Sequence, residues 1–163
     1  MSKSYGELSN VIGDRGEFIV RALLTEYVQF DGPLFRPVYM GEKHQMLDFF
    51  VELTGGGGGH GYFMAQVKTT TRVPNSKGLP VPSISKDHWN RISKLPGPSF
   101  MFGVQEQTSR VFAVAIRQPR TRGVASVPLK NELSVDRLLI LYEEVKEFWA
   151  AHSRKPAAST FDL

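Results

Sequence analysis

Residues 47–70 read LDFFVELTGGGGGHGYFMAQVKTT, and this stretch decides the fold that the sequence predicts. Two apolar runs, 47–53 and 62–68, flank five consecutive glycines, a pattern that indicates a β-hairpin. If the hairpin is centred on the glycines, Asp48 lies opposite Gln66, with Cβ atoms about 5 Å apart. A glycine loop specifies register weakly, so a slip of two residues stays open.

Side chains alternate along a strand, and this alternation decides which polar groups share a face. Asp48 and Glu52 point to the same side of the first run, and Gln66 and Lys68 point to the same side of the second. An acid, an amide and a lysine therefore meet at one end of the sheet. Glu52 competes with Asp48 for the same role but lies farther from Gln66 in this register.

A long helix is predicted before the hairpin, starting near Ser9 or Asn10, either of which can cap it, and ending near Val28. At helical spacing Glu17 shares the buried face with three apolar residues, Val20, Leu24 and Tyr27. Glycine is costly inside a helix, so Gly13 and Gly16 indicate that another element packs closely there.

The rest of the chain predicts three more strands and two more helices. The strands are expected at 35–40, 99–104 and 110–116, the last two as a second hairpin. A polar loop is expected over 69–82, and the helices over 85–93, with Ser85 as its cap, and 134–152. This order predicts an α/β sandwich on a mixed sheet.

Composition places the chain among single globular domains. Its 163 residues, 41% hydrophobic and 22% charged, fit one domain over 1–153, followed by a frayed tail over 154–163. The absence of cysteine excludes disulfides and thiolate metal sites. With no apolar stretch of membrane-spanning length and no signal-peptide pattern, we expect a cytoplasmic protein without a membrane partner. The net charge of +4 permits a polyanionic partner.

The oxygen-rich end of the hairpin predicts a magnesium site. Hydrolysis of a phosphodiester is assisted by a metal that polarises the phosphate and by a cation that steadies the developing charge. Mg²⁺ prefers oxygen ligands, including one or two carboxylates, which Asp48 and Glu17 can supply. The side-chain carbonyl of Gln66 and the backbone carbonyl of Val67 are neutral ligands. Lys68 can hold the attacking water or the scissile phosphate, and Mn²⁺ can substitute for Mg²⁺.

These motifs resemble the PD-(D/E)XK nuclease superfamily. The resemblance rests on GDRGE at 13–17 in the first helix, LDF at 47–49 and QVKTT at 66–70, and it covers about residues 11–116. More narrowly, the chain resembles a prokaryotic family of unknown function within that superfamily. Its Gln-x-Lys form resembles the variant in Mrr-type restriction enzymes.

The resemblance implies a restriction-endonuclease-like sandwich and metal-dependent hydrolysis of DNA. It implies that Asp48, Gln66 and Lys68 form the core of the catalytic site and that Glu17 is an acid contributed by the first helix. It further implies a prokaryotic role in defence against foreign DNA or in its processing. Gln66 stands where most of the superfamily has glutamate, which removes one negative charge from the metal site.

Polar residues around the motif are candidates for contacts with nucleic acid. Thr69, Thr70 and Arg72 follow Lys68 and can contact phosphate oxygens, with an ordinary polar loop as the alternative. The short helix adds three candidates beside Trp89, namely Lys86, His88 and Arg91. Trp89 itself is more simply explained as a core residue. Three arginines, Arg117, Arg120 and Arg122, form a basic turn that either steers DNA or is a solvated face.

Two functions other than cleavage stay open. A nuclease-derived fold that binds nucleic acid or a partner protein without cutting is supported by Gln66. It predicts salt-sensitive DNA binding that persists without divalent metal. A domain that binds only protein would show no DNA affinity even at low salt. RNA is an alternative substrate to DNA, and a homodimer or a partner protein can supply specificity, because no separate recognition domain is evident.

Overall fold

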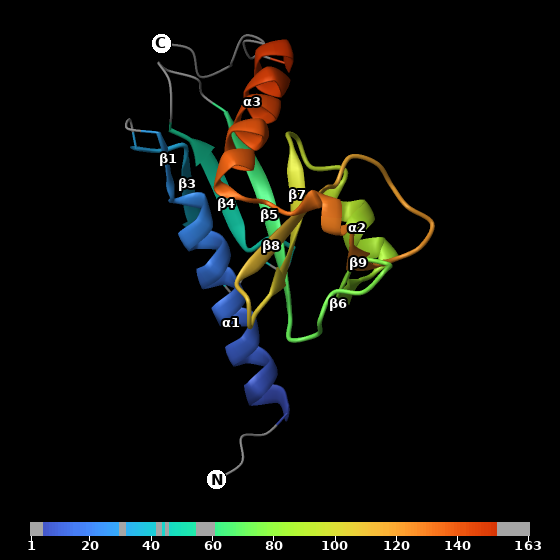
Figure 1. The fold of residues 1–163 in the computed structure, drawn as a ribbon. Coiled ribbons are helices and arrows are strands. Elements are labelled where there is room, and N and C mark those ends of the chain that lie inside the picture. The colour runs from blue at the N-terminus through green and yellow to red at the C-terminus, as the bar shows by residue number, and fades with distance from the viewer. Residues whose placement is uncertain (1–4, 30–31, 42–43, 45, 55–60, 153–163) are drawn as a thin grey trace.

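A computed structural model describes residues 5–29, 32–41, 44, 46–54 and 61–152. They form an α/β fold in which helices flank a mixed sheet of five strands (Figure 1). The predicted α/β sandwich on a mixed sheet is therefore confirmed. The predicted tail lies outside the described residues, as does the glycine run.

Along the described chain, runs of consecutive strands separate the helices. The helices are α1 (Tyr5–Leu24), α2 (Lys86–Ile92), the 3₁₀ helix η1 (Leu129–Asn131) and α3 (Val135–His152). The central sheet contains β3 (Phe35–Tyr39), β4 (Phe49–Leu53), β5 (Tyr62–Thr70), β7 (Ser99–Gln105) and β8 (Arg110–Ala115). Two further pairs form small sheets, β1 (Tyr27–Gln29) with β2 (Gly32–Pro33), and β6 (Leu79–Ile84) with β9 (Val124–Val127).

The central sheet has the strand order β3-β4-β5-β7-β8, which makes β5 its middle strand. β3, β4 and β5 pair antiparallel, as do β7 and β8, whereas β5 and β7 are parallel. Parallel neighbours need a crossover connection. Residues 71–98 provide it and contain β6 and α2.

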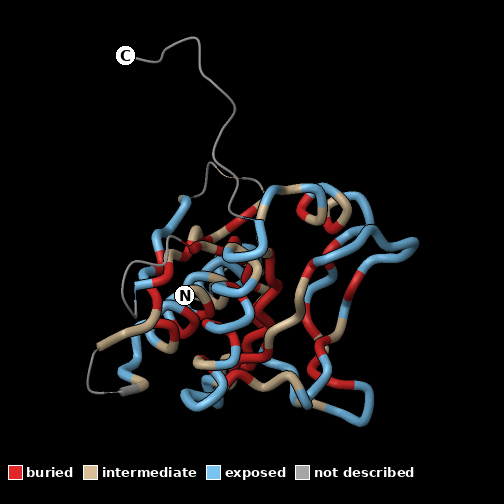
Figure 2. The backbone as a smooth tube through the Cα atoms, turned by 90° about the horizontal axis from the view of Figure 1, so that it is seen from above, coloured by how far each residue is buried: buried red, intermediate tan, exposed pale blue. Residues whose placement is uncertain are grey.

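Two hydrophobic clusters cover the two faces of the sheet. The first packs α1 and α3 against one face and includes Leu24, Phe63 and Leu138. The second packs α2, β6 and β9 against the other face and includes Leu79 and Trp89. Buried segments therefore run through the middle of the molecule (Figure 2). Because close packing on both faces restrains β5, the side chains that this strand carries have fixed positions.

The predicted register of the hairpin is confirmed. Phe49 lies opposite Ala65 and Phe50 opposite Met64. These pairs have the predicted register, without the two-residue slip that the glycine loop allows. Asp48 lies just beyond the paired residues, and its side chain meets that of Gln66 through a hydrogen bond. The strands predicted at 47–53 and 62–68 correspond to β4 and to most of β5.

The predicted bounds of the first helix were wrong at both ends. α1 begins at Tyr5, so Ser9 and Asn10 lie inside it and cap nothing. It ends at Leu24, where Thr25 donates from its backbone N–H and its hydroxyl to carbonyls of the last turn. Tyr27 consequently belongs to β1 and is 69% exposed, so it does not share the buried face of the helix.

The later elements were predicted more accurately. α2 has the expected cap, since Ser85 Oγ accepts a hydrogen bond of 3.2 Å from the His88 N–H. Trp89 is buried, as its core interpretation requires. The second hairpin forms as β7 and β8, and α3 buries four residues of its apolar stripe, Leu138, Leu141, Tyr142 and Val145.

The loop predicted over 69–82 was wrong, because this segment contains the start of a strand. β6 pairs with β9 in a separate small sheet and buries Leu79 and Val81. Pro80 and Pro82 lack the N–H that a sheet ladder uses, which obscures the strand pattern in the sequence. Within the described part of the chain, no helix is long and apolar enough to cross a membrane.

Candidate functional site

The predicted site residues of the hairpin form a hydrogen-bonded group. Asp48 directly precedes β4, and its Oδ2 accepts a hydrogen bond of 2.5 Å from the backbone N–H of Val67. The side-chain amide of Gln66 donates from Nε2 to the same oxygen at 2.6 Å. Asp48 Oδ1 has no hydrogen bond within the described residues, so this oxygen is available to a ligand.

Asp48 takes this position because the ladder between β4 and β5 ends there. Its N–H still donates to the Ala65 carbonyl at 2.9 Å. The next inward-facing N–H of β5, that of Val67, meets the Asp48 carboxylate instead of a backbone carbonyl. In a strand the C=O of a residue points to the same side as its N–H, so the Val67 carbonyl also faces this site. Gln66 Nε2 donates to it at 3.3 Å.

α1 brings a second carboxylate to the site. Gly16 lies against Thr69, so close that a Cβ at Gly16 would overlap the Thr69 side chain. This contact explains why glycine is present in the helix there. No comparable contact exists at Gly13, where a Cβ would meet nothing within 4 Å. The close approach of α1 to β5 places Glu17 within electrostatic range of Asp48 and Lys68.

The environment of Glu17 favours its neutral form. The pKa of Glu17 is raised to about 7, chiefly by burial and also by the negative charges of Asp48 and Asp14. A hydrogen bond from Tyr39 and the positive charge of Lys68 oppose these effects on the pKa. Near neutral pH this carboxylate therefore exchanges a proton readily.

The pKa of Asp48 is likewise set by effects that act in opposite directions. Burial raises the pKa of Asp48, although the Val67 N–H, Lys68, His88 and Gln66 all act in the opposite direction. Two acids in a partly desolvated site both bind protons more strongly than acids in water. A divalent cation would reverse this preference, because its charge stabilises both carboxylates.

The oxygen atoms of the site fit the ligand chemistry of Mg²⁺. Glu17 and Asp48 supply two carboxylates, and Val67 supplies a backbone carbonyl. Gln66 can add its amide oxygen if the amide turns over, since its Nε2 faces Asp48 in this structure. Among the described residues no group of three or more His, Cys, Asp or Glu side chains could hold a metal ion. Ion binding here would therefore depend on neutral oxygens as well as carboxylates.

Tyr39 and His88 belong to the site in ways that sequence reasoning missed. Tyr39 ends β3 opposite Phe49, beside Asp48, and hydrogen-bonds Glu17. The pairing of β3 with β4, which places Tyr39 opposite Phe49, is the feature that could have identified Tyr39 from the sequence. His88, expected to contact nucleic acid, acts electrostatically on Asp48, and its Nε2 lies 3.3 Å from the Met46 carbonyl. No local sequence pattern reports this proximity, because α2 reaches the site through the crossover.

Of the other residues predicted to contact nucleic acid, some are buried and some are exposed. Thr69 and Thr70 are buried at the end of β5, and Thr70 Oγ1 accepts a hydrogen bond of 3.1 Å from the Arg72 N–H. Arg72, Lys86 and Arg91 are exposed and can meet a polyanion.

Glu52, the competitor of Asp48, lies at the opposite end of the hairpin. Its carboxylate pairs with Arg36 on the neighbouring strand. The ion pair provides a local partner for its charge. The structure therefore favours Asp48 over Glu52 as the site acid.

The basic turn expected around Arg120 is attached to α2. The Arg120 N–H donates to Asn90 Oδ1 at 2.7 Å, and Asn90 Nδ2 donates to the Arg120 carbonyl at 3.1 Å. The Arg120 guanidinium lies over the Trp89 ring, 5.4 Å from its centroid. These contacts hold the turn against the helix that also carries His88.

Cavities of about 560, 470 and 200 Å³ lie elsewhere on the molecule and include none of Glu17, Asp48, Gln66 and Lys68 in their walls. The candidate site is therefore distinct from these three cavities. Compared with protein-family models and with curated protein sequences, the chain gives no significant match. The chemistry of the site consequently rests on its own residues.

Proposed function

We propose that this protein is a Mg²⁺-dependent nuclease that hydrolyses phosphodiester bonds of DNA. The observation that carries the proposal is the meeting of Glu17 from α1, Asp48 before β4, and Gln66 and Lys68 from β5. Two neighbouring acids with raised pKa values repel each other when both are charged, and a divalent cation would relieve that repulsion. The adjacent lysine is suited to contact a phosphate. The resemblance of the motifs to the PD-(D/E)XK superfamily supports the same chemistry.

Each residue has a specific role in this proposal. Asp48 and Glu17 hold the ion through their carboxylates, assisted by the Gln66 amide oxygen and the Val67 carbonyl. The bound ion would polarise the scissile phosphate and activate water. Lys68 would orient the attacking water and stabilise the charge that develops on the phosphate. Glu17 would release its proton when the ion binds.

Exposed cations around the site support a polyanionic substrate. Arg72 follows β5, and Lys86 and Arg91 lie on α2, the helix whose His88 acts on Asp48. The net charge of +4 favours the same class of partner. A role in defence against foreign DNA, or in its processing, is the biological setting that we propose for the cleavage.

A plasmid-nicking assay tests the proposal directly. Purified protein is incubated with supercoiled DNA in Mg²⁺ or Mn²⁺, with EDTA as the metal-free control. We expect metal-dependent nicking that Lys68→Ala reduces by about 10²-fold or more. Lys146→Ala is the matched control, because Lys146 pairs with Glu143 on the surface of α3. Full activity of folded Lys68→Ala would reject the site assignment.

One observation favours a second function, the binding of nucleic acid or a partner protein without cleavage. The Gln66 amide and the Val67 N–H already satisfy one oxygen of Asp48 without any ion. In that case DNA binding, measured in EDTA, would weaken steeply with salt and no metal would produce nicking. Repeating the titration with single-stranded RNA would identify the preferred nucleic acid.

The variant Gln66→Glu separates these two functions. The substitution adds a third carboxylate beside Asp48 and Glu17, which strengthens ion binding and raises repulsion when no ion is present. If the protein is a nuclease, the variant should reach full activity at a lower Mn²⁺ concentration. A binding module should gain metal affinity, measured by calorimetry, without any nicking.

A further inference from the structure

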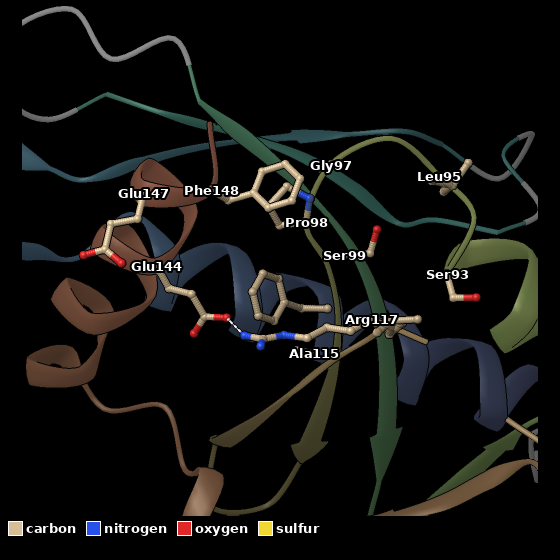
Figure 3. Close-up of a pocket in the computed structure, with 12 residues that line it drawn as sticks. Ser93, Leu95, Gly97, Pro98, Ser99, Ala115, Arg117, Glu144, Glu147 and Phe148 are labelled. Carbon is tan, nitrogen blue, oxygen red and sulfur yellow. Dashed lines mark hydrogen bonds and ion pairs between the residues drawn. The ribbon is translucent and has the colours of Figure 1, made fainter. Parts of the chain in front are cut away.

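A cavity of about 560 Å³ lies at the edge of the central sheet (Figure 3), and none of Glu17, Asp48, Gln66 and Lys68 lines it. Its walls come from the segment after α2, the start of β7, the end of β8, and α3. A hollow of this size is within the range that holds a small organic molecule. β8 is the outer strand of the central sheet.

One wall of the cavity carries a buried hydroxyl without a partner. Ser99, the first residue of β7, is 4% exposed, and its Oγ forms no hydrogen bond within the described residues. A buried polar atom without a partner is unfavourable, and such atoms are uncommon in folded proteins. A polar group of a ligand in this cavity would give Ser99 the missing hydrogen bond.

The charges around the cavity do not cancel. Arg117 pairs with Glu144 across the cavity, as the dashed line in Figure 3 shows. Glu147, one turn later on α3 and also in the wall, has no ion-pair partner within the described part of the chain. The three charged side chains of the lining sum to one negative charge. Arg117, the one cation among them, already pairs with Glu144. The lining favours a cationic ligand over an anionic one.

The remaining walls are apolar and include two aromatic rings. Phe100 forms part of the core, and Phe148 is held between Trp149, at 5.4 Å between centroids, and His152, at 4.2 Å. Leu95 and Pro98 complete the apolar lining. Such walls bind a flat or aliphatic body, and aromatic faces also attract cations.

We propose that this cavity binds a small organic cation, an amine or guanidinium on an aromatic or aliphatic body. The charged group pairs with Glu147, the body lies against Phe100 and Phe148, and a polar atom hydrogen-bonds Ser99. The proposal is independent of nuclease activity, because it involves none of Glu17, Asp48 and Lys68.

Calorimetric titration of the full chain in EDTA tests the charge preference. The ligands are tryptamine, its neutral analogue tryptophol, and the anion indole-3-propionate, which share an indole body and differ in the terminal group. We expect tryptamine to bind about fivefold more tightly than tryptophol, and indole-3-propionate more weakly than either. Absence of tryptamine binding, or equal affinity for all three, would overturn the proposal.

Two variants test the residues, and one variant is the control. Glu147→Gln should abolish the preference for tryptamine over tryptophol, whereas Glu143→Gln, which changes a carboxylate paired with Lys146 outside the cavity, should leave it intact. Ser99→Ala should weaken tryptamine binding and raise the melting temperature of the ligand-free protein, because a buried unpaired hydroxyl is removed. Unchanged preference in Glu147→Gln, or unchanged affinity in Ser99→Ala, would contradict the assignment.

Discussion

The two ends of the β4–β5 hairpin each carry an acid on the same face, yet the two acids have different surroundings. At one end Asp48 is partly buried near Glu17 and receives hydrogen bonds from Val67 and Gln66. At the other end Glu52 forms an ion pair with the exposed Arg36. The comparison shows that position on a strand face does not make a site. The two acids differ because Asp48 is partly buried, and its carboxylate receives hydrogen bonds rather than an ion pair.

The largest effect is expected from substituting Asp48. Asp48→Ala should reduce metal-dependent nicking by about 10²-fold or more, because it removes a carboxylate that we propose holds the ion. Glu52→Ala is the matched control and should retain nearly full activity. Circular dichroism of both variants shows whether the fold is preserved. Comparable losses in the two variants would mean that the hairpin ends do not differ as proposed.

A second prediction concerns the packing of α1 against β5, which brings Glu17 close to Asp48. Gly16→Ala should destabilise the protein by roughly 1–3 kcal/mol, since the new methyl group overlaps Thr69 on the restrained middle strand. Gly13→Ala, three residues earlier in the same helix, should stabilise it by about 0.5–1 kcal/mol, because nothing lies within 4 Å. Urea unfolding measures both. Similar values for the two alanines would show that Gly16 is not held against β5.

The third prediction uses the pH dependence of Glu17. The pKa of Glu17 is raised to about 7 in the folded protein from an ordinary value of 4.5. Its contribution to stability is therefore fully present below the lower value and is lost as pH rises through about 7. Glu17→Gln imitates the neutral form, so its melting temperature should exceed that of the wild type above pH 7 and approach it in acid. A constant difference across pH would indicate that Glu17 keeps an ordinary pKa.

The smallest effect is expected at the exposed end of the hairpin. Glu52→Gln breaks the pair with Arg36, whose side chain is 69% exposed. Exposed ion pairs contribute about 0–1 kcal/mol, so the free energy of unfolding should fall by less than about 1 kcal/mol. The loss should shrink further in high salt, which urea unfolding at two salt concentrations can detect. A larger, salt-independent loss would mean that this end is also a tightly organised site.

The hairpin and its register could be predicted because they depend on local patterns. Alternating side chains define the two runs, and centring the hairpin on the glycine loop gives the register in which Phe49 lies opposite Ala65. Fold class follows from the order of such elements. The start of α1 was misplaced because Ser9 and Asn10 are common capping residues, although the helix continues through both.

The features that were not predicted, β6 and the roles of Tyr39 and His88, depend on contacts between residues far apart in the sequence. β6 contains two prolines and is stabilised by β9, which follows it by about forty residues, so its local pattern is weak. The approach of Tyr39 to Glu17 and of His88 to Asp48 likewise depends on how separate elements pack. A single sequence shows which residues can serve a site, whereas packing determines which of them meet.

The parallel pairing of β5 with β7 has a consequence for the order of folding. The hairpins β4–β5 and β7–β8 join neighbours in sequence, so each can form rapidly with little loss of chain entropy. Joining them requires residues 71–98 to close as a loop, a non-local step that slows folding. We therefore expect the docking of the two hairpins to limit the folding rate. The carboxylate–amide group of Asp48 and Gln66 could then assemble in the first hairpin before the sheet is complete.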